Sequence, residues 1–203
     1  LASLLAFLEN GDHLLMVDSA YGPSRQLAKG LFSRLGVKHT FYDPLIGAGI
    51  KKLIQSNTKV IFTEAPGSLT FEMQDIPAIT KAAHLTGAKV IMDNTWASPF
   101  LCNPFALGVD VSVQAGTKYI VGHSDAMLGM VTTNKECFSA IEQVFDDLGA
   151  SASPDDCYLA LRGMRTLALR LERQGRTGLQ LAEWLAGRRE VSRVLHPALK
   201  EDP

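Results

Sequence analysis

Short apolar runs recur along the chain, and segments with helical spacing or turn residues separate them. The runs are rich in valine, isoleucine and leucine, a pattern typical of strands buried in a sheet. The runs that predict strands of one sheet are 13–18, 37–42, 59–64, 88–93, 109–113 and 126–133. A further strand is expected over residues 191–197.

Helices are predicted between these strands, because capping residues and glycines mark their ends. Asp75, Asn134 and Ser153 predict helix N-caps. The predicted helices are 1–10, 24–35, 46–55, 75–86, 134–148 and 154–185, with a helical turn at 104–107 and a break of the last helix near Gly175. Strands that alternate with helices imply an α/β fold with a mostly parallel sheet. The link between the last two strands is too short for a crossover helix, so this pair is expected to be antiparallel.

Polar or aromatic residues follow several of the predicted strands. Tyr21, Ser68, Asp93 and Lys118 all stand at carboxyl ends of strands, which share one edge of a parallel sheet. Because ligands of open α/β sheets bind at that edge, we expect these residues to meet in one cleft. A lysine amine can form a Schiff base, a carboxylate can pair with a pyridinium nitrogen, and the Thr117 hydroxyl can bind a phosphate. The set therefore predicts a pyridoxal-phosphate site.

Several motifs resemble those of one known enzyme family. The Asp-Asn-Thr-Trp run at 93–96, the Thr-Lys-Tyr run at 117–119 and the Gly-His-Ser-Asp run at 122–125 are similar to motifs of the cysteine/methionine-metabolism family of pyridoxal-phosphate enzymes. Supporting stretches lie at 20–24, 41–47 and 64–68. The resemblance covers almost the whole chain and weakens after residue 177. Within the family it is strongest to the bacterial cystathionine β-lyases.

The resemblance implies the aspartate aminotransferase-like, fold type I architecture, a three-layer α/β large domain around a mostly parallel sheet. Residues 1–186 would belong to this pyridoxal-phosphate-binding large domain, with its amino-terminal part missing. Residues 187–203 would begin a smaller C-terminal domain. Both ends look cut, since the chain begins in a predicted helix and stops soon after a predicted strand. We therefore interpret it as an internal fragment of a longer protein.

The activity implied by the resemblance is that of a carbon–sulfur lyase, the β-elimination of L-cystathionine to homocysteine, pyruvate and ammonia in methionine biosynthesis. Lys118 would hold pyridoxal 5′-phosphate and act as the catalytic base, and Asp93 would keep the pyridine nitrogen protonated. Tyr21 would stack on the ring and assist a proton transfer. Thr117 would bind the phosphate, and Ser68 would contact a ligand oxygen. Tyr21 and Ser68 equally suit ordinary loop positions, so both interpretations stay open.

Residues near Lys118 predict supporting roles. Ala115 has no hydroxyl where other family members carry a phosphate-binding serine, so only its backbone could contact a phosphate. His123 and Asp125 are expected to brace the lysine loop through hydrogen bonds rather than to act as acid or base. Arginines spaced along the last predicted helix are interpreted as a solvated or inter-subunit face. They are Arg162, Arg165, Arg170, Arg173 and Arg176.

Composition places the chain among globular proteins, with 203 residues, 46% hydrophobic and 20% charged, and a formal net charge of −1. Neither nucleic acid nor an anionic membrane surface is therefore an expected partner, and no run approaches the roughly 20 apolar residues of a membrane helix. Three cysteines without a CxxC pair favour a reducing, cytoplasmic compartment and predict no disulfide or metal site. A sulfur amino acid is the expected small-molecule partner, and the resemblance implies a homotetramer.

Other functions stay open on the sequence. A γ-lyase or γ-synthase of the same family would use the same Lys118 and Asp93 on another sulfur amino acid. A nicotinamide-dependent dehydrogenase is disfavoured, because the Gly-Ala-Gly run at 47–49 lacks the third glycine of a dinucleotide loop. A catalytically incompetent fragment with the family fold is a further alternative, since an active site that needs absent segments is incomplete.

Overall fold

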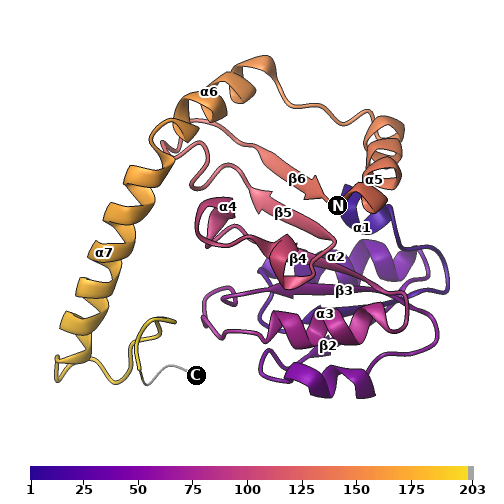
Figure 1. Ribbon diagram of the computed structural model, residues 1–203, viewed down its shortest axis with the longest axis horizontal. Helices are drawn as coiled ribbons and strands as arrows, with labels where there is room; N and C mark the ends of the chain where they lie inside the picture. Colours follow the sequence, from indigo (N-terminus) through magenta and orange to yellow (C-terminus); the bar gives the residue numbers. More distant parts are fainter. Residues whose placement is uncertain (201–203) are drawn as a thin grey trace.

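A six-stranded sheet forms the centre of the computed structural model, which describes residues 1–200 (Figure 1). The strands are β1 (His13–Val17), β2 (Lys38–Tyr42), β3 (Thr58–Glu64), β4 (Lys89–Asp93), β5 (Val111–Ala115) and β6 (Gly129–Thr133). They lie in the order β2-β1-β3-β4-β5-β6; β5 and β6 pair antiparallel and the other neighbours pair parallel. The predicted mostly parallel α/β sheet and its antiparallel last pair are thus confirmed.

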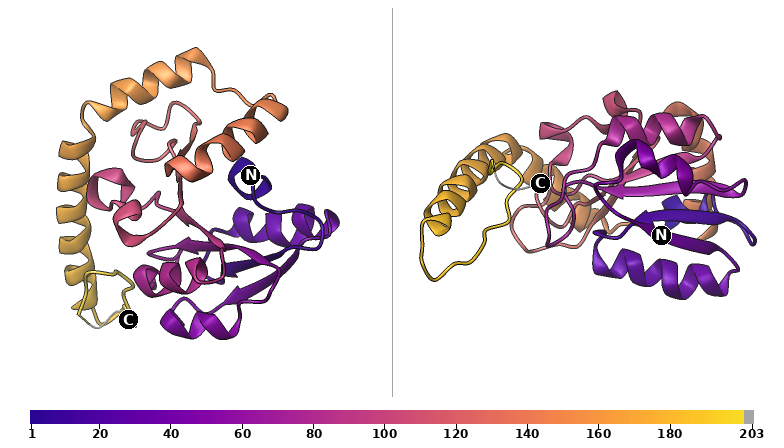
Figure 2. Two further views of the ribbon diagram at one scale, coloured as in Figure 1. Left: turned by 45° about the vertical axis from the view of Figure 1, so that its right-hand side comes forward. Right: turned by 90° about the horizontal axis from the view of Figure 1, so that it is seen from below.

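Helices cover both faces of this sheet (Figure 2). They are α1 (Ala2–Leu5), α2 (Gly22–Leu27), α3 (Ile76–His84), α4 (Ser98–Leu101), α5 (Lys135–Asp147), α6 (Pro154–Met164) and α7 (Leu167–Ala186). The connection β1-α2-β2 and the connection β3-α3-β4 run in opposite directions along the sheet, so right-handed crossovers place α2 and α3 on opposite faces. Every residue of β1 is consequently buried.

Side chains cap the helices where the sequence predicts helix starts. Asp75 Oδ1 accepts the Ala78 N–H at 3.1 Å, and Asn134 Oδ1 accepts the Cys137 N–H at 2.9 Å. Ser153 caps α6 in the same way. Each bond satisfies a backbone donor that has no partner inside the helix, and such a cap contributes about 1 kcal/mol.

The first predicted helix is wrong in its length. Helix α1 ends at Leu5, whereas the spacing of apolar residues predicted a helix to residue 10. Asp12 Oδ2 accepts the Glu9 N–H at 2.8 Å, a bond that a continuing helix would replace by a backbone carbonyl. The side chain of Asp12 therefore favours a turn before β1.

The end of the chain also differs from the prediction. The break in the last helix falls at Arg165 and Thr166, between α6 and α7, while Gly175 lies inside α7. The predicted strand at 191–197 is wrong, since these residues form neither strand nor helix. Within residues 1–200, no strand pairs with this segment to complete a ladder of backbone hydrogen bonds.

Two clusters of buried apolar side chains stabilise the fold. The larger one extends through the sheet and includes Leu15, Ile61 and Ile91. The smaller one joins α6 and α7 to the segment after β5, and its members are Ile120, Val121, Ala160, Leu167 and Leu171. We call α6 and α7 together the arm (residues 154–186); it passes along the outer side of the molecule (Figures 1 and 2).

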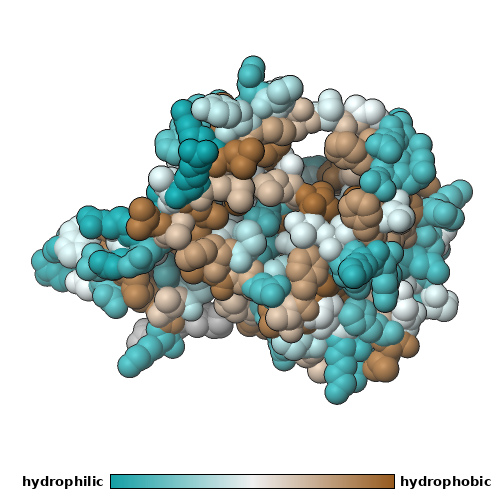
Figure 3. Space-filling model, turned by 45° about the horizontal axis from the view of Figure 1, so that its top comes forward, coloured by the Kyte–Doolittle hydropathy of each residue, from teal (hydrophilic) through white to brown (hydrophobic). Residues whose placement is uncertain are grey.

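Helix α7 ends at Ala186, the last residue of the predicted large domain. That residues 187–203 begin a smaller domain stays a prediction, and its last three residues, 201–203, lie outside the described part. Figure 3 shows apolar side chains at the surface among hydrophilic ones. Of the helices described, none is both long and apolar enough to cross a membrane.

Candidate functional site

A cleft of about 1080 Å³ opens at the carboxyl edge of the sheet. All five residues singled out from the sequence line it: Tyr21, Ser68, Asp93, Thr117 and Lys118. They follow four different strands, and parallel strands bring their carboxyl ends to one edge. The structure therefore brings these residues together, while their chemical roles stay predictions.

Asp93 is oriented by its neighbour Thr95. Its Oδ1 accepts hydrogen bonds from the Thr95 backbone N–H (2.9 Å) and hydroxyl (2.5 Å). The Thr95 hydroxyl also accepts the Ala115 N–H at 2.8 Å, which ties the end of β4 to the end of β5. Burial raises the pKa of Asp93, and the two Thr95 bonds act in the opposite direction. Among the described residues, no hydrogen bond reaches Oδ2, so this oxygen is left for a ligand.

Lys118 stands on a tight turn that its own backbone stabilises. Its N–H donates to the Ala115 carbonyl at 2.9 Å, and its carbonyl accepts the Gly122 N–H at 2.9 Å. Gly122 adopts φ +76°, a backbone conformation that residues with a Cβ rarely adopt. The amine of Lys118 is exposed at the cleft, where a ligand can reach it.

Thr117 and Ala115 offer less to a phosphate than the sequence suggested. The Thr117 hydroxyl accepts the Leu128 N–H at 2.9 Å and lies 3.3 Å from the Leu128 carbonyl. The Ala115 N–H is already bonded to Thr95. A phosphate contact from Thr117 would compete with the Leu128 bonds, so that role stays a prediction.

Tyr21 is held by Glu64, the last residue of β3. Its backbone N–H donates to Glu64 Oε2 at 2.8 Å, while the residue as a whole is 54% exposed and lines the cleft. Burial raises the pKa of Glu64 from 4.5 to about 7; the Tyr21 bond lowers it and the Asp93 charge raises it. Glu64 is therefore a titratable group inside the cleft.

The Gly-His-Ser-Asp loop makes hydrogen bonds and an ion pair, in line with a bracing role. His123 Nδ1 bonds to the Val121 carbonyl at 2.7 Å, and Asp125 pairs with Arg162 of the arm at 3.0 Å. His123 is exposed at the surface. The expectation that these residues stabilise the loop rather than act as acid or base fits these contacts.

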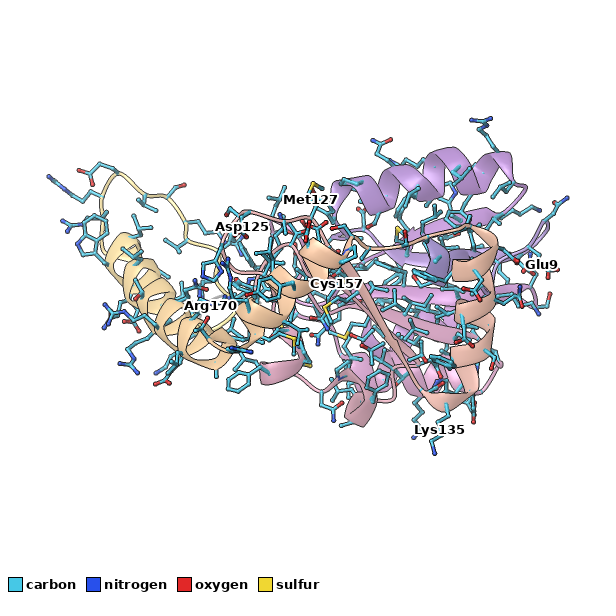
Figure 4. All side chains as sticks on the ribbon, turned by 90° about the horizontal axis from the view of Figure 1, so that it is seen from above. Glu9, Asp125, Met127, Lys135, Cys157 and Arg170 are labelled. Carbon is cyan, nitrogen blue, oxygen red and sulfur yellow. The ribbon has the colours of Figure 1, made fainter. Side chains whose placement is uncertain are left out.

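Arg170 is a site residue that the sequence missed. The arginine series was interpreted as a solvated or inter-subunit face, and no role in the cleft was predicted for Arg170, yet this side chain is half-buried and lines the cleft (Figure 4). Its Nη2 donates to the Gly163 carbonyl at 2.8 Å and its Nε to the Thr166 hydroxyl at 3.0 Å. A Cβ on Gly122 would collide with its guanidinium group. Arg170 thus packs directly on the turn that carries Lys118.

Gly163 makes the second close contact between the arm and this turn. A Cβ at this position of α6 would collide with the carbonyl oxygens of Ile120 and Val121. Only glycine therefore lets α6 approach the lysine turn so closely. A glycine inside a predicted helix was the signal in the sequence that could have located this contact.

The described residues fit the ring and the amine chemistry of the cofactor that the motifs imply. A reachable lysine amine, a carboxylate oxygen without a partner and an exposed aromatic ring stand in the same cleft, from Lys118, Asp93 and Tyr21. Such a set suits a flat, cationic heteroaromatic ring that carries an aldehyde. Within residues 1–200, no group of three or more His, Cys, Asp or Glu side chains is placed to hold a metal ion.

Comparison with known proteins gives an independent result. The family model described as Cys/Met metabolism PLP-dependent enzyme matches residues 1–203. A relative from Rhizobium johnstonii is 53% identical over 98% of this chain and 50% of its own length. The cystathionine beta-lyase of Escherichia coli strain K12 is 46% identical over 97% of this chain and 50% of its own length. The L-alanine/L-glutamate racemase of Wolbachia pipientis wMel is 39% identical over 99% of this chain and 49% of its own.

The solved structures include a match to the whole chain. The crystal structure of metB from Corynebacterium glutamicum has a TM-score of 0.96 and 37% sequence identity, and the match covers 100% of this chain and 54% of that one. This similarity confirms the predicted fold type I architecture. The chain spans about half the length of the curated relatives it matches.

Proposed function

Because the chain belongs to the Cys/Met metabolism family of pyridoxal-phosphate-dependent enzymes, we propose that the protein eliminates the β-sulfur substituent of L-cystathionine. With the uptake of water the products are homocysteine, pyruvate and ammonia. The observation that carries the proposal is the meeting of the Lys118 amine, the Asp93 carboxylate and the Tyr21 ring in one cleft. The similarity to lyases supports this choice among the reactions open to the family.

The roles of the polar residues follow from their positions. Pyridoxal phosphate, when bound, supplies an electron sink for the charge left when an amino acid loses its α-proton. Lys118 would bind the cofactor's aldehyde carbon through its amine, and the same amine, when not bonded to the cofactor, would take the α-proton of the substrate. Asp93 lines the cleft and would hold the proton of the ring nitrogen through Oδ2, because the two Thr95 bonds go to Oδ1.

The remaining residues would position the ring and the substrate. Tyr21 lines the cleft and would lie against the cofactor ring, where its hydroxyl would assist a proton transfer. Ser68 lines the cleft and would donate its hydroxyl to a ligand oxygen. Thr117 would contribute to the phosphate site from the turn beside the lysine.

Reductive labelling tests the cofactor attachment. The protein is incubated with pyridoxal phosphate, reduced with borohydride, digested and mapped by mass spectrometry. A phosphopyridoxyl group on Lys118 is expected, and Lys118→Ala should remove it. Lys135→Ala, at an exposed lysine on α5, is the matched control and should leave the label in place. A label spread over other lysines, or none on Lys118, would contradict the proposal.

A substrate panel tests the reaction itself. Cystathionine is expected to yield pyruvate and homocysteine. A γ-lyase would release 2-oxobutyrate instead, and a racemase would invert the α-carbon of alanine or glutamate without releasing a keto acid. Should the 203-residue chain bind no cofactor while a version extended at both ends does, the chain is an incompetent fragment of the enzyme.

The wider setting belongs to the same proposal. We propose that residues 1–186 belong to a cofactor-binding large domain and that residues 187–203 lead into a smaller one. A homotetramer in the cytoplasm that acts on a sulfur amino acid is the assembly and setting that the resemblance supports. Light scattering of the protein extended at both ends measures the number of subunits in the assembly.

A further inference from the structure

Two carboxyl groups stand side by side at the floor of the cleft. Glu64 ends β3 and Asp93 ends β4, and the two residues are direct partners in the parallel register. Both line the same cleft. Asp93 has a role in the proposed chemistry, whereas Glu64 has none so far.

The position of Glu64 is fixed from two sides. Its Oε2 accepts the Tyr21 N–H at 2.8 Å, which anchors the segment that carries the exposed Tyr21 ring. Its backbone carbonyl accepts Gln74 Nε2 at 2.7 Å, and Gln74 Oε1 in turn accepts the buried Tyr42 hydroxyl at 2.9 Å. Glu64 therefore connects the Tyr21 segment to the end of β3, the strand that pairs with the strand of Asp93.

The two carboxyl groups differ in how readily they lose their proton. Asp93 accepts two hydrogen bonds from Thr95, whereas Glu64 accepts one from the Tyr21 backbone. Hydrogen-bond donors stabilise the charged form, so Asp93 ionises first and Glu64 keeps its proton longer. The pKa of Glu64 is accordingly raised to about 7, by burial and then by the charge of Asp93.

Other titratable groups face the same region. The Lys118 amine and the Tyr21 phenol line the cleft with Glu64. Glu72, from the segment before α3, places its Oε2 near Gly67, 3.0 Å from where a Cβ of that residue would stand. A lysine ammonium favours an ionised Glu64 and a second glutamate disfavours it, so these charges oppose each other.

We propose that Glu64 is a positioning residue of this site: its carboxyl group holds the Tyr21 segment through the backbone N–H and, by losing or gaining a proton, sets the negative charge beside Asp93. The inference rests on the proposed role of Asp93 toward a cationic ring nitrogen. An ionised Glu64 adds a second negative charge next to that of Asp93 and strengthens the attraction for a cation there. A protonated Glu64 leaves Asp93 as the charged carboxylate of the pair.

Variants at Glu64 separate the two parts of this role. Glu64→Gln keeps an acceptor for the Tyr21 N–H and removes the titration. Glu64→Ala removes both. Glu64→Asp keeps an acid on a shorter side chain, and Glu142→Gln, at an exposed position of α5, is the matched control.

The dissociation constant of pyridoxal phosphate is measured for each variant at about pH 6 and about pH 8, on either side of the Glu64 pKa of about 7. Glu64→Gln should bind like the parent at the lower pH and about 3- to 10-fold more weakly at the higher pH. Glu64→Ala should bind more weakly at both, since it also loses the Tyr21 anchor. Glu64→Asp should keep the pH dependence, and Glu142→Gln should match the parent throughout.

Two results would overturn the inference: Glu64→Gln matches the parent at both pH values, or it weakens binding equally at both, as a purely structural residue would. Circular dichroism checks that each variant is folded. If Glu64→Gln does not fold, Glu64→Asp replaces it in the test, and a loss of the pH dependence of cofactor binding in Glu64→Asp would overturn the inference. Asp93→Asn separates this inference from the proposed function. Unchanged cofactor binding in Asp93→Asn would contradict the proposed role of Asp93. Weaker binding in Asp93→Asn, together with unchanged binding in Glu64→Gln, would contradict only the role inferred for Glu64.

Discussion

The sheet and the arm approach the cleft from different sides, and they are stabilised in different ways. Every residue of β1 is buried, and Ile91 in β4 is fully buried. On the arm, by contrast, Leu169 is 70% exposed and Trp184 is 55% exposed. The sheet therefore supplies a rigid floor with its own core, whereas the arm depends on a small apolar cluster and a few polar contacts.

This difference separates the groups proposed for chemistry from those that support them. Asp93 and Glu64 end buried strands, and Lys118 follows the next strand along the sheet. Arg170 and Gly163 belong to the arm and contact the lysine turn from outside. We infer that the sheet positions the reactive groups, and that the arm stabilises the turn that carries Lys118 by packing against it.

Removal of the Lys118 amine should have a large effect on activity and little effect on the stability of the sheet. Lys118→Ala should lower elimination activity by about 10³-fold or more, because it removes both the attachment point and the base. The stability of the sheet should not change, since the side chain is exposed. Pyruvate release and urea unfolding measure the two effects. Normal activity in this variant would contradict the proposed chemistry.

A matched pair of truncations compares the sheet with the arm directly. Ile91→Ala opens a cavity in a core position and should reduce the free energy of unfolding by about 2–5 kcal/mol. Leu169→Ala removes a side chain that is 70% exposed and should change it by less than about 0.5 kcal/mol. Urea denaturation of both variants gives the comparison. Equal losses would show that the arm belongs to the same cooperative core as the sheet.

The contact between the arm and the lysine turn is tested at Gly163. Gly163→Val places a side chain against the carbonyl groups of Ile120 and Val121, and should cost about 1–3 kcal/mol of packing at that contact. Cofactor affinity is expected to fall about 10-fold if about 1.4 kcal/mol of that cost falls on the cofactor-bound state. Circular dichroism should show that the sheet is still folded. Gly175→Ala, at an open position of α7, is the control and should leave affinity unchanged. A Gly163→Val protein with full affinity would show that the arm does not position the turn.

The smallest expected effect is a change in the pH dependence of stability. Glu64 has a pKa of about 7 in the folded chain, above its ordinary value of 4.5. The unfolded chain releases this proton first as the pH rises, so stability declines between about 4.5 and about 7. Glu64→Gln should reduce this decline by an amount of the order of 1 kcal/mol, allowing for partial solvent screening. Urea unfolding of the cofactor-free protein at several pH values measures it, and an identical decline in both proteins would exclude Glu64 as the source.

Local patterns predicted most of the elements correctly. The cap at Asp75 and the cap at Asn134 were found because each depends on a side chain and a backbone donor only three residues apart. The length of the first helix and the strand at 191–197 were predicted wrongly. In the first case a side chain of the following turn competes with the helix, and in the second no neighbouring strand is present in the described chain to pair with it.

Sequence patterns were enough to predict the alternation of strands and helices, and with it the gathering of Asp93 and Lys118 at one sheet edge. Both follow from local periodicity and from the rule that parallel strands end on the same side. The folded structure was needed to show that Glu64 pairs with Asp93 across adjacent strands, and that Arg170 lines the cleft. These placements depend on which distant segments pack together, and a charged residue at a strand end or on a helix carries no local signal of the neighbour it will meet.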